Sequence, residues 1–255
     1  MCTLIILRRP GHRWPVLIGA NRDEMIERPT RPPARHWPDR PEVVAGLDVL
    51  AGGSWLGVND WGVAAAVLNR TGSLGPLPGR RSRGELVLEA LDHADAADAT
   101  AALSALDPAA YRSFNLILSD SRDGFWLRHT GEGRIEAHPL KEGLSLIAAG
   151  DLVDDSGDDR ATRRLALAAP RFRVAPVPDP ERGDWTAWEN LLAGDEAPPG
   201  EPAEAVLRFR THGGFATVSS ALLALPTREE PALKSVFRYA EWLPQPAPWR
   251  AIDLG

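Results

Sequence analysis

Short β-branched runs joined by tight turns recur along the first 150 residues, and this pattern constrains the fold more than any other feature. Thr3 to Leu7 and Val16 to Ala20 are two such runs on either side of Pro10-Gly11-His12. This spacing predicts a β-hairpin. Ser54 to Val58 and Val63 to Leu68 flank a second turn-like segment and predict another. The other strand candidates are Phe114 to Leu118, Phe125 to His129, Ile135 to Pro139, Ser145 to Ala149, Ala216 to Leu225 and Val236 to Tyr239.

Helical segments are expected between these groups of strands. Ser82-Arg83-Gly84-Glu85 matches a capping box and begins an Ala/Leu-rich stretch that ends near Leu106, long enough for one helix or two. Asp159 to Ala168 and Asp184 to Ala193 are shorter candidates. Antiparallel strands with helices between groups of hairpins indicate an α+β layered protein, not a βαβ repeat.

Two stretches rich in proline lie outside this pattern, Pro29 to Pro41 and Pro176 to Pro202. We predict that both are surface loops, and either could also frame the mouth of a pocket. The chain shows no internal repeat and no long linker. Its 255 residues are therefore expected to form a single domain, residues 1–255.

The composition excludes several classes of protein. Hydrophobic residues make up 44% and charged residues 25%, as in ordinary globular proteins. No apolar run approaches the roughly 20 residues of a membrane span, and the run Thr3 to Leu7 is too short for a secretory signal, so we expect a cytoplasmic location. A net charge of −6 argues against binding to nucleic acid. Arginine accounts for 27 of the 29 basic residues, which indicates a GC-rich, bacterial genome.

Cys2 is the only cysteine, so the chain can form neither an internal disulfide nor a cysteine zinc cluster. Initiator methionine is normally removed before so small a residue, and removal would place a free α-amine on the residue that carries the thiol. A thiol has a pKa of about 8.5 and an α-amine one near 8, so one residue can supply both a nucleophile and its base. The alternative is a structural cysteine.

A charged cluster follows the second predicted strand at Asn21-Arg22-Asp23-Glu24. If the first two strands pair, this cluster lies close to Cys2. An arginine lowers the pKa of a neighbouring thiol, and a carboxylate can orient an ammonium group. The cluster is either part of a Cys2 site or a hydrated turn with a local salt bridge.

An ordered set of motifs resembles the NRDE family, also called the transport and Golgi organisation protein 2 family. The set opens with Met1-Cys2-Thr3 and Ala20-Asn21-Arg22-Asp23-Glu24 and continues to about residue 120. The second half of the chain resembles the family only weakly. The remaining motifs are Arg28-Pro29, Gly46-Leu47-Asp48, Gly52-Gly53-Ser54-Trp55-Leu56-Gly57, Arg83-Gly84-Glu85-Leu86-Val87 and Phe114-Asn115-Leu116-Ile117.

More distantly, Asn59 to Asn69 resembles a segment of penicillin V acylases and bile-salt hydrolases, which are N-terminal nucleophile hydrolases with a catalytic cysteine. That resemblance implies a four-layer αββα sandwich of two antiparallel sheets flanked by helices. It also implies that Arg22 and Asp23 assist Cys2 and that the Asn69 amide donates to an oxyanion. Asn69 could instead be a residue of a strand-end turn.

The chain departs from these families at two places. Family members often carry Leu-Ser-Asn where this chain has Ala148-Ala149-Gly150-Asp151, so Gly150 or Asp151 replaces an asparagine. An arginine expected from the hydrolases is not evident in Gly214 to Ser220. The nucleophile is thus present while its partners are incomplete. Candidate ligand-binding residues that complete the predicted site are Asn21, Glu24, Arg28, Trp55 and Asp151.

Two functions from different classes follow. The first is an acyl hydrolase in which Cys2 attacks the amide or thioester of a small apolar acyl compound. The second is a non-enzymatic binding or trafficking protein that holds haem, acyl-CoA or a lipid in the same pocket, as the family resemblance implies. No cofactor is required in either case, haem is a possible ligand, and the six histidines show no metal-ligand spacing.

Overall fold

Two antiparallel sheets stack face to face in the computed structural model, which describes residues 2–154, 163–196, 199–200 and 205–255. The first sheet has the strand order β10-β1-β2-β11-β12-β13, and the second runs from β3 to β9 in sequence order. The strands are β1 (Thr3–Arg8), β2 (Val16–Met25), β3 (Thr30–Ala34), β4 (Val43–Asp48), β5 (Leu56–Asn59), β6 (Ala64–Asn69), β7 (Phe114–Ser119), β8 (Gly124–His129), β9 (Glu136–Pro139), β10 (Gly143–Ile147), β11 (Phe215–Leu225), β12 (Val236–Glu241) and β13 (Arg250–Ala251).

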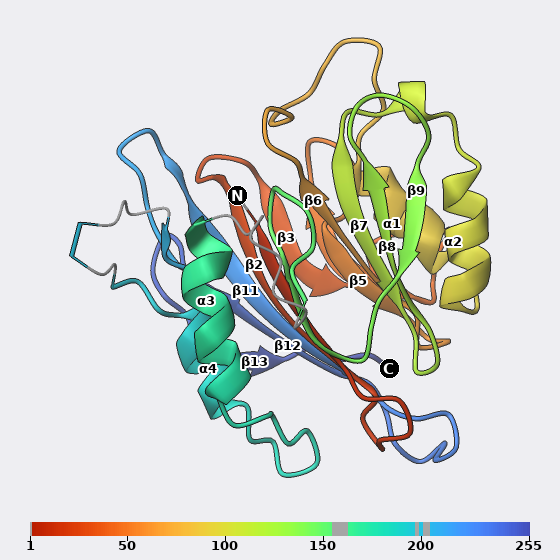
Figure 1. Cartoon of the computed structure of the whole chain (residues 1–255), viewed down its shortest axis with the longest axis vertical. Helices are drawn as coiled ribbons and strands as arrows, with labels where there is room; N and C mark the ends of the chain where they lie inside the picture. The colour runs from red at the N-terminus through yellow and green to blue at the C-terminus, as the bar shows by residue number, and fades with distance from the viewer. Residues whose placement is uncertain (1, 155–162, 197–198, 201–204) are drawn as a thin grey trace.

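Helices cover the outer face of each sheet (Figure 1). The pair α3 (Arg163–Val174) and α4 (Thr186–Leu192) lies against the first sheet, and α1 (Gly84–Leu91) and α2 (Ala96–Ser104) lie against the second. A short 3₁₀ turn, Pro108–Ala110, follows α2. The layer order is therefore αββα, as predicted.

Residue alternation along the strands produces three apolar layers. On β1, Leu4 and Ile6 face the second sheet, whereas Ile5 packs against the α3 and α4 layer. Such alternation is what a strand buried on both faces requires. The inner layer between the sheets is completed by side chains such as Val58 and Leu223, both almost fully buried.

The predicted hairpins are confirmed. β1 pairs with β2 in a register that sets Thr3 opposite Asn21. β2 is longer than predicted and continues to Met25, so the charged cluster lies within the strand and not in a turn after it. This register brings the start of β1, and with it Cys2, beside the second half of β2.

The first proline-rich stretch is partly a strand, which corrects the prediction of a loop for Pro29 to Pro41. β3 carries Pro32 and Pro33 and forms the edge of the second sheet. Proline has no N–H to donate, and an edge strand leaves one row of backbone groups unpaired, so proline is tolerated there.

Two helices form where the sequence allowed one or two, because Asp95 caps α2 by accepting from the Asp98 N–H. The predicted capping box is wrong: Ser82 Oγ accepts from the Gly84 N–H, and Glu85 pairs with Arg81. The predicted helix at Asp159 to Ala168 lies partly outside the described residues. No helix in the described part of the chain is long and apolar enough to span a bilayer.

Candidate functional site

Cys2 lines a cleft with a volume of about 500 Å³. It stands just before β1, where the pairing with β2 brings the Asp23 N–H to 3.4 Å from the sulfur. The side chain is half-buried and contacts the inner apolar layer. The thiol therefore has one face in the protein interior and one in the cleft.

The surroundings of Cys2 disfavour ionisation of its thiol. Burial raises its pKa, and the Asp23 carboxylate acts in the same direction. The Asp23 N–H and the Arg22 guanidinium act in the opposite direction but do not overcome burial. A neutral thiol needs a base to become a nucleophile.

The Asp23 carboxylate points to the helical layer on the other side of the sheet. Its Oδ2 lies 2.5 Å from Nη1 of Arg164 on α3, and its Oδ1 accepts a 2.7 Å hydrogen bond from Thr217 on β11. Arg164 Nη1 also donates to Thr3 Oγ1 at 3.2 Å. This buried group of polar side chains fixes β1, β2, β11 and α3 directly behind Cys2.

Arg22 points into the cleft, with its guanidinium 4.2 Å from the centre of the Trp55 ring. Glu24 and Asp48 lie 3.6 Å and 3.9 Å from Arg22 Nη2. Arg28 donates to Asp48 at 2.7 Å. These five residues form one side of the cleft, and their opposite charges are mutually compensated.

Gly46 makes room for Trp55. A Cβ atom on Gly46 would lie 2.3 Å from Cζ2 of the Trp55 ring, which is closer than any real contact. The two motifs therefore depend on each other, because the Trp55 ring occupies the space that a side chain at position 46 would need. The stacked Arg22 depends on both.

The opposite side of the cleft is rich in arginine with few acidic neighbours. Arg83 donates to the Ser73 and Ser113 carbonyls, and Arg112 donates to the carbonyls of Gly72, Leu74 and Gly75. Burial lowers the pKa of Arg83 to about 10, and the charge of Arg112 acts in the same direction. Among the described residues, neither guanidinium forms a salt bridge. The arginines that line the whole cleft are Arg22, Arg28, Arg80, Arg81, Arg83 and Arg112.

Two backbone segments meet at the edge of this cleft. The Ser54 N–H donates to the Gly84 carbonyl at 3.0 Å, and a Cβ atom on Gly53 would lie 2.5 Å from the Gly84 carbonyl carbon. Because Gly53 and Gly84 have no side chains, the two backbone segments can touch directly. This contact holds Arg83, next to Gly84, at the same cleft as Cys2.

Asn69 ends β6 and lines the cleft together with Cys2. Its side chain is half-buried, and within the described residues no hydrogen bond to its amide occurs. An amide that is held at a strand end and free to donate suits the stabilisation of an oxyanion. The role predicted for Asn69 remains a prediction.

Asn21 is placed differently from the rest of its cluster. Its amide nitrogen donates to the carbonyls of Leu192 and Leu207 at 2.9 Å and 2.8 Å, and its oxygen accepts from Ser220. The side chain therefore joins β2 to the α4 layer and does not reach the cleft. Asn21 lines a small cavity beside Cys2 instead, and its predicted contact with ligand remains a prediction.

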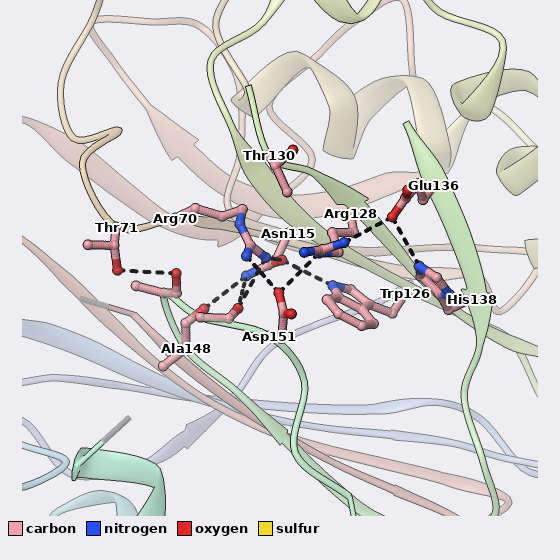
Figure 2. A network of polar contacts seen from close by, with 12 residues as sticks. Arg70, Thr71, Asn115, Trp126, Arg128, Thr130, Glu136, His138, Ala148 and Asp151 are labelled. Atoms are coloured by element: carbon pink, nitrogen blue, oxygen red, sulfur yellow. Dashed lines mark hydrogen bonds and ion pairs between the residues drawn. The ribbon is translucent and has the colours of Figure 1, made fainter. Parts of the chain in front are cut away.

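Asp151 lies in a polar network (Figure 2) and is not among the residues that line the cleft. Its Oδ1 lies 2.6 Å from Arg70 Nη2 and 3.1 Å from Arg128 Nε. Burial acts to raise the pKa of Asp151, but these two arginines together lower it below its usual range. Asn115 donates to the Gly150 carbonyl at 2.8 Å. The network connects β7 and β8 to the segment after β10. Gly150 and Asp151, which stand where family members often carry an asparagine, both take part in it.

The predicted catalytic residues are thus brought together, along with part of the predicted ligand-binding set. The structure adds residues that the sequence did not single out. Arg164 had one usable signal: with Ala168 and Phe172 it falls at four-residue spacing on the apolar face of α3, where a charge requires a partner. No group of three His, Cys, Asp or Glu residues suited to a metal occurs in the described ranges. The residues that line the cleft as predicted are Cys2, Arg22, Asp23, Asn69, Glu24, Arg28 and Trp55.

Three solved structures that share this fold are an acid amidase ortholog, a bile acid hydrolase variant and a penicillin V acylase. An N-acylethanolamine-hydrolyzing acid amidase ortholog from Caenorhabditis elegans matches 91% of this chain and 96% of its own, with a TM-score of 0.59 and 14% identity. A variant of conjugated bile acid hydrolase from Clostridium perfringens matches 99% and 92%, with a TM-score of 0.55 and 12% identity. Penicillin V acylase from Agrobacterium tumefaciens matches 98% and 86%, with a TM-score of 0.51 and 14% identity. These likenesses show the N-terminal nucleophile hydrolase-like fold.

Curated relatives match parts of the chain. The Transport and Golgi organization protein 2 homolog of Bos taurus is 39% identical over 111 residues, which are 41% of this chain and 38% of the relative. The Mus musculus homolog is 40% identical over 77 residues, or 28% of this chain and 26% of the relative. The matched regions thus span well under half of these relatives. The family described as Transport and Golgi organisation 2 matches residues 1–149, more than half of the chain. With the motifs of residues 1 to 120 in their expected order, the chain belongs to the Transport and Golgi organisation 2 family.

Proposed function

We propose that the chain is an N-terminal-cysteine acyl hydrolase that acts on an amide or thioester of a small apolar acyl compound. One observation carries the proposal: the Cys2 thiol opens into a cleft of about 500 Å³ at the start of β1, with the Asp23 N–H 3.4 Å behind the sulfur. Three hydrolases of this fold, named above, support the reaction class.

The chemistry needs a base, because burial raises the pKa of the Cys2 thiol. Removal of Met1 supplies one as the α-amine of the same residue. The amine takes the thiol proton as Sγ attacks the acyl carbonyl, and the oxyanion that forms is within reach of the Asn69 amide in this proposal. The C–N or C–S bond then breaks and the amine returns the proton to the leaving group. Water hydrolyses the Cys2 thioester to a carboxylic acid and restores the thiol.

A second candidate function is a carrier that binds an acyl-CoA without turnover, which one observation favours. Arg83 and Arg112 line the cleft opposite Arg22 and have no carboxylate partner among the described residues. Phosphate groups bind well to such guanidinium pairs. The carrier and the hydrolase share the cleft and differ in whether Cys2 is needed.

We propose that haem suits this cleft less well than an acyl compound. A planar apolar slot would suit the porphyrin, but six arginines and the carboxylates of Glu24 and Asp48 line the cleft. No histidine lines it in the described part of the chain, and the raised pKa of Cys2 disfavours the thiolate that would bind iron.

The deciding experiment begins with the intact mass of the purified protein, which reports whether Met1 has been removed. The protein is then incubated with N-acetylcysteamine thioesters, penicillin V and acyl-CoA, and both the mass of the acyl adduct and the release of free thiol are followed. We expect an adduct on the wild type and none on Cys2→Ala.

A matched control tests the base. A lysine inserted between Met1 and Cys2 keeps the thiol but prevents Met1 removal, so the amine of Cys2 stays blocked. Acylation of this variant should be strongly reduced. A retained Met1, or a free Cys2 that forms no adduct with any substrate, contradicts the hydrolase. Tight binding of acyl-CoA that Cys2→Ala retains would favour the carrier.

A further inference from the structure

A second, smaller cavity adjoins the cleft in the layer between the two sheets. Its volume is about 20 Å³, enough for roughly one water molecule. Cys2, Arg22, Trp55 and Val67 line both this cavity and the cleft. The cavity therefore begins beside the thiol, at the Arg22–Trp55 stack, and extends away from solvent.

Small residues on three strands create this cavity. Ala20 on β2, Ala66 on β6 and Ala221 on β11 all belong to the inner apolar layer and line it. Leu4 and Leu68 line it as well. Protein interiors are otherwise packed with few gaps as large as a water molecule. The gap lies where two sheets present alanine to each other next to the proposed nucleophile.

The lining selects for apolar groups of limited length. Polar residues also line it, but their polar groups are engaged elsewhere. Thr3 accepts from Arg164, and Asn21 and Ser220 bond to each other. Arg22 stacks on Trp55, and the Ser219 hydroxyl contacts Tyr239. A water molecule there would have few partners, whereas a methyl or methylene group needs none. Leu4 and Leu68 are almost fully buried and limit the depth.

We infer that this cavity is the acyl subsite of the enzyme and that it accepts a short acyl chain, with one or two carbons beyond the carbonyl. The inference rests on the proposed acyl transfer to Cys2. The leaving group then occupies the larger cleft on the arginine side, while the acyl carbons enter between the sheets. Acyl chains with more than two carbons beyond the carbonyl, from butyryl upward, do not fit completely, and their remaining carbons would stay in the cleft.

The test measures acylation of Cys2 by N-acetylcysteamine thioesters of acetate, propionate, butyrate, hexanoate and octanoate. Intact mass reports the adduct and thiol release gives the rate. Each methylene that enters an apolar site is worth about a fourfold gain. We expect kcat/KM to rise about fourfold from acetyl to propionyl, to level off at butyryl and to fall for hexanoyl and octanoyl.

Two variants change the cavity in opposite directions. Ala66→Val fills it and should abolish the gain from acetyl to propionyl. Leu68→Ala enlarges it and should move the optimum to longer chains. Ala64→Val is the matched control, because Ala64 lies on the same face of β6 but lines neither the cavity nor the cleft. Its chain-length profile should equal that of the wild type, and thermal unfolding confirms that each variant is folded.

The outcomes separate the subsite from the reaction. Acylation with a flat profile, or one that rises steadily to octanoyl, overturns the short-chain subsite and leaves the hydrolase intact. If no thioester acylates Cys2, the proposed function fails, and methyl NMR of the Cys2→Ala protein with propionamide then decides about the cavity. Shifts confined to Ala66, Leu68 and Ala221 would support a short-chain site, and unchanged resonances would overturn it.

Discussion

The Arg164 guanidinium on α3 lies 2.5 Å from the Asp23 carboxylate on β2, and both side chains are buried. The two residues are 141 positions apart in the sequence. The pair sits directly behind Cys2 and joins the outer helical layer to the strand that carries the family's charged motif. Its integrity is thus a structural condition for the site.

Removal of one partner should be costly. Arg164→Met takes the cation from a buried carboxylate, and losses of about 3–5 kcal/mol are typical for a broken buried pair. We expect the free energy of unfolding to fall by that order, measured by chemical denaturation. Asp23→Asn combined with Arg164→Met should recover part of the loss. Equal destabilisation by the double variant and the sum of the singles would contradict a direct interaction.

Asn69 tests the electrophile side of the mechanism. Asn69→Ala removes the proposed oxyanion donor, and the acylation rate of Cys2 should fall by about 10²–10³. Asn69→Asp keeps the shape but not the donor and should lose a similar factor. Stability should change little, because within the described residues the amide has no hydrogen bond to lose. Unchanged acylation in both variants would remove Asn69 from the mechanism.

Gly46 should not tolerate even a methyl group. The Cβ atom of Gly46→Ala would lie 2.3 Å from the Trp55 ring, which must move and take the stacked Arg22 with it. We expect a loss of about 1–3 kcal/mol of stability, as for other overpacked sites, together with slower acylation. Gly213→Ala is the control, since the nearest atom to its Cβ is 3.9 Å away. If both variants behave alike, the Trp55 contact is not what requires glycine.

Arg112 separates ligands by their charge. If the arginine side of the cleft binds the phosphates of an acyl-CoA, Arg112→Gln should weaken acyl-CoA by about 10–100-fold, the usual range for a charge-assisted contact. N-acetylcysteamine thioesters of the same acyl group carry no phosphate and should be affected far less. The ratio of the two kcat/KM values is the measurement. If the ratio does not change, the Arg112 guanidinium only stabilises the loop of residues 72–75 and does not bind phosphate.

His129 should make the fold sensitive to mild acid. Burial lowers its pKa, and the charge of Arg80 acts in the same direction. As the pH falls, His129 is therefore protonated at a higher pH in the unfolded chain than in the folded one. Its contribution to the free energy of unfolding is fully present above about pH 6.5 and is lost as the pH falls toward the folded-state pKa. The slope for one proton is at most about 1.4 kcal/mol per pH unit. His129→Phe should flatten the loss between pH 7 and 5, while the exposed His212→Gln should not. Equal slopes for all three proteins would exclude His129 as the cause.

The sequence predicted most of the fold because the relevant signals are local. The continuous apolar run after Thr3 indicates a strand buried on both faces, and the turns indicate the hairpin partners. β3 was missed because proline usually argues against a strand, and only its place at the sheet edge explains it.

The site was less predictable because its contacts join distant segments. Arg164 reaches Asp23 from the far side of the sheet, and nothing near either residue indicates that pairing. Asp151 and Asn21 were chosen for their position in motifs, yet both carry their hydrogen bonds within the framework. A motif shows which residues gather near a site but not which side of the strand each one faces.

The contact between Gly53 and Gly84 has a consequence for how such a cleft can change. Because two backbones touch there, the distance between the Trp55 and Arg83 segments does not depend on any side chain that substitution could lengthen or shorten. Substitutions on either side of the cleft can therefore change which ligands it binds. The width of the cleft at this contact is set by the backbone and does not change with them.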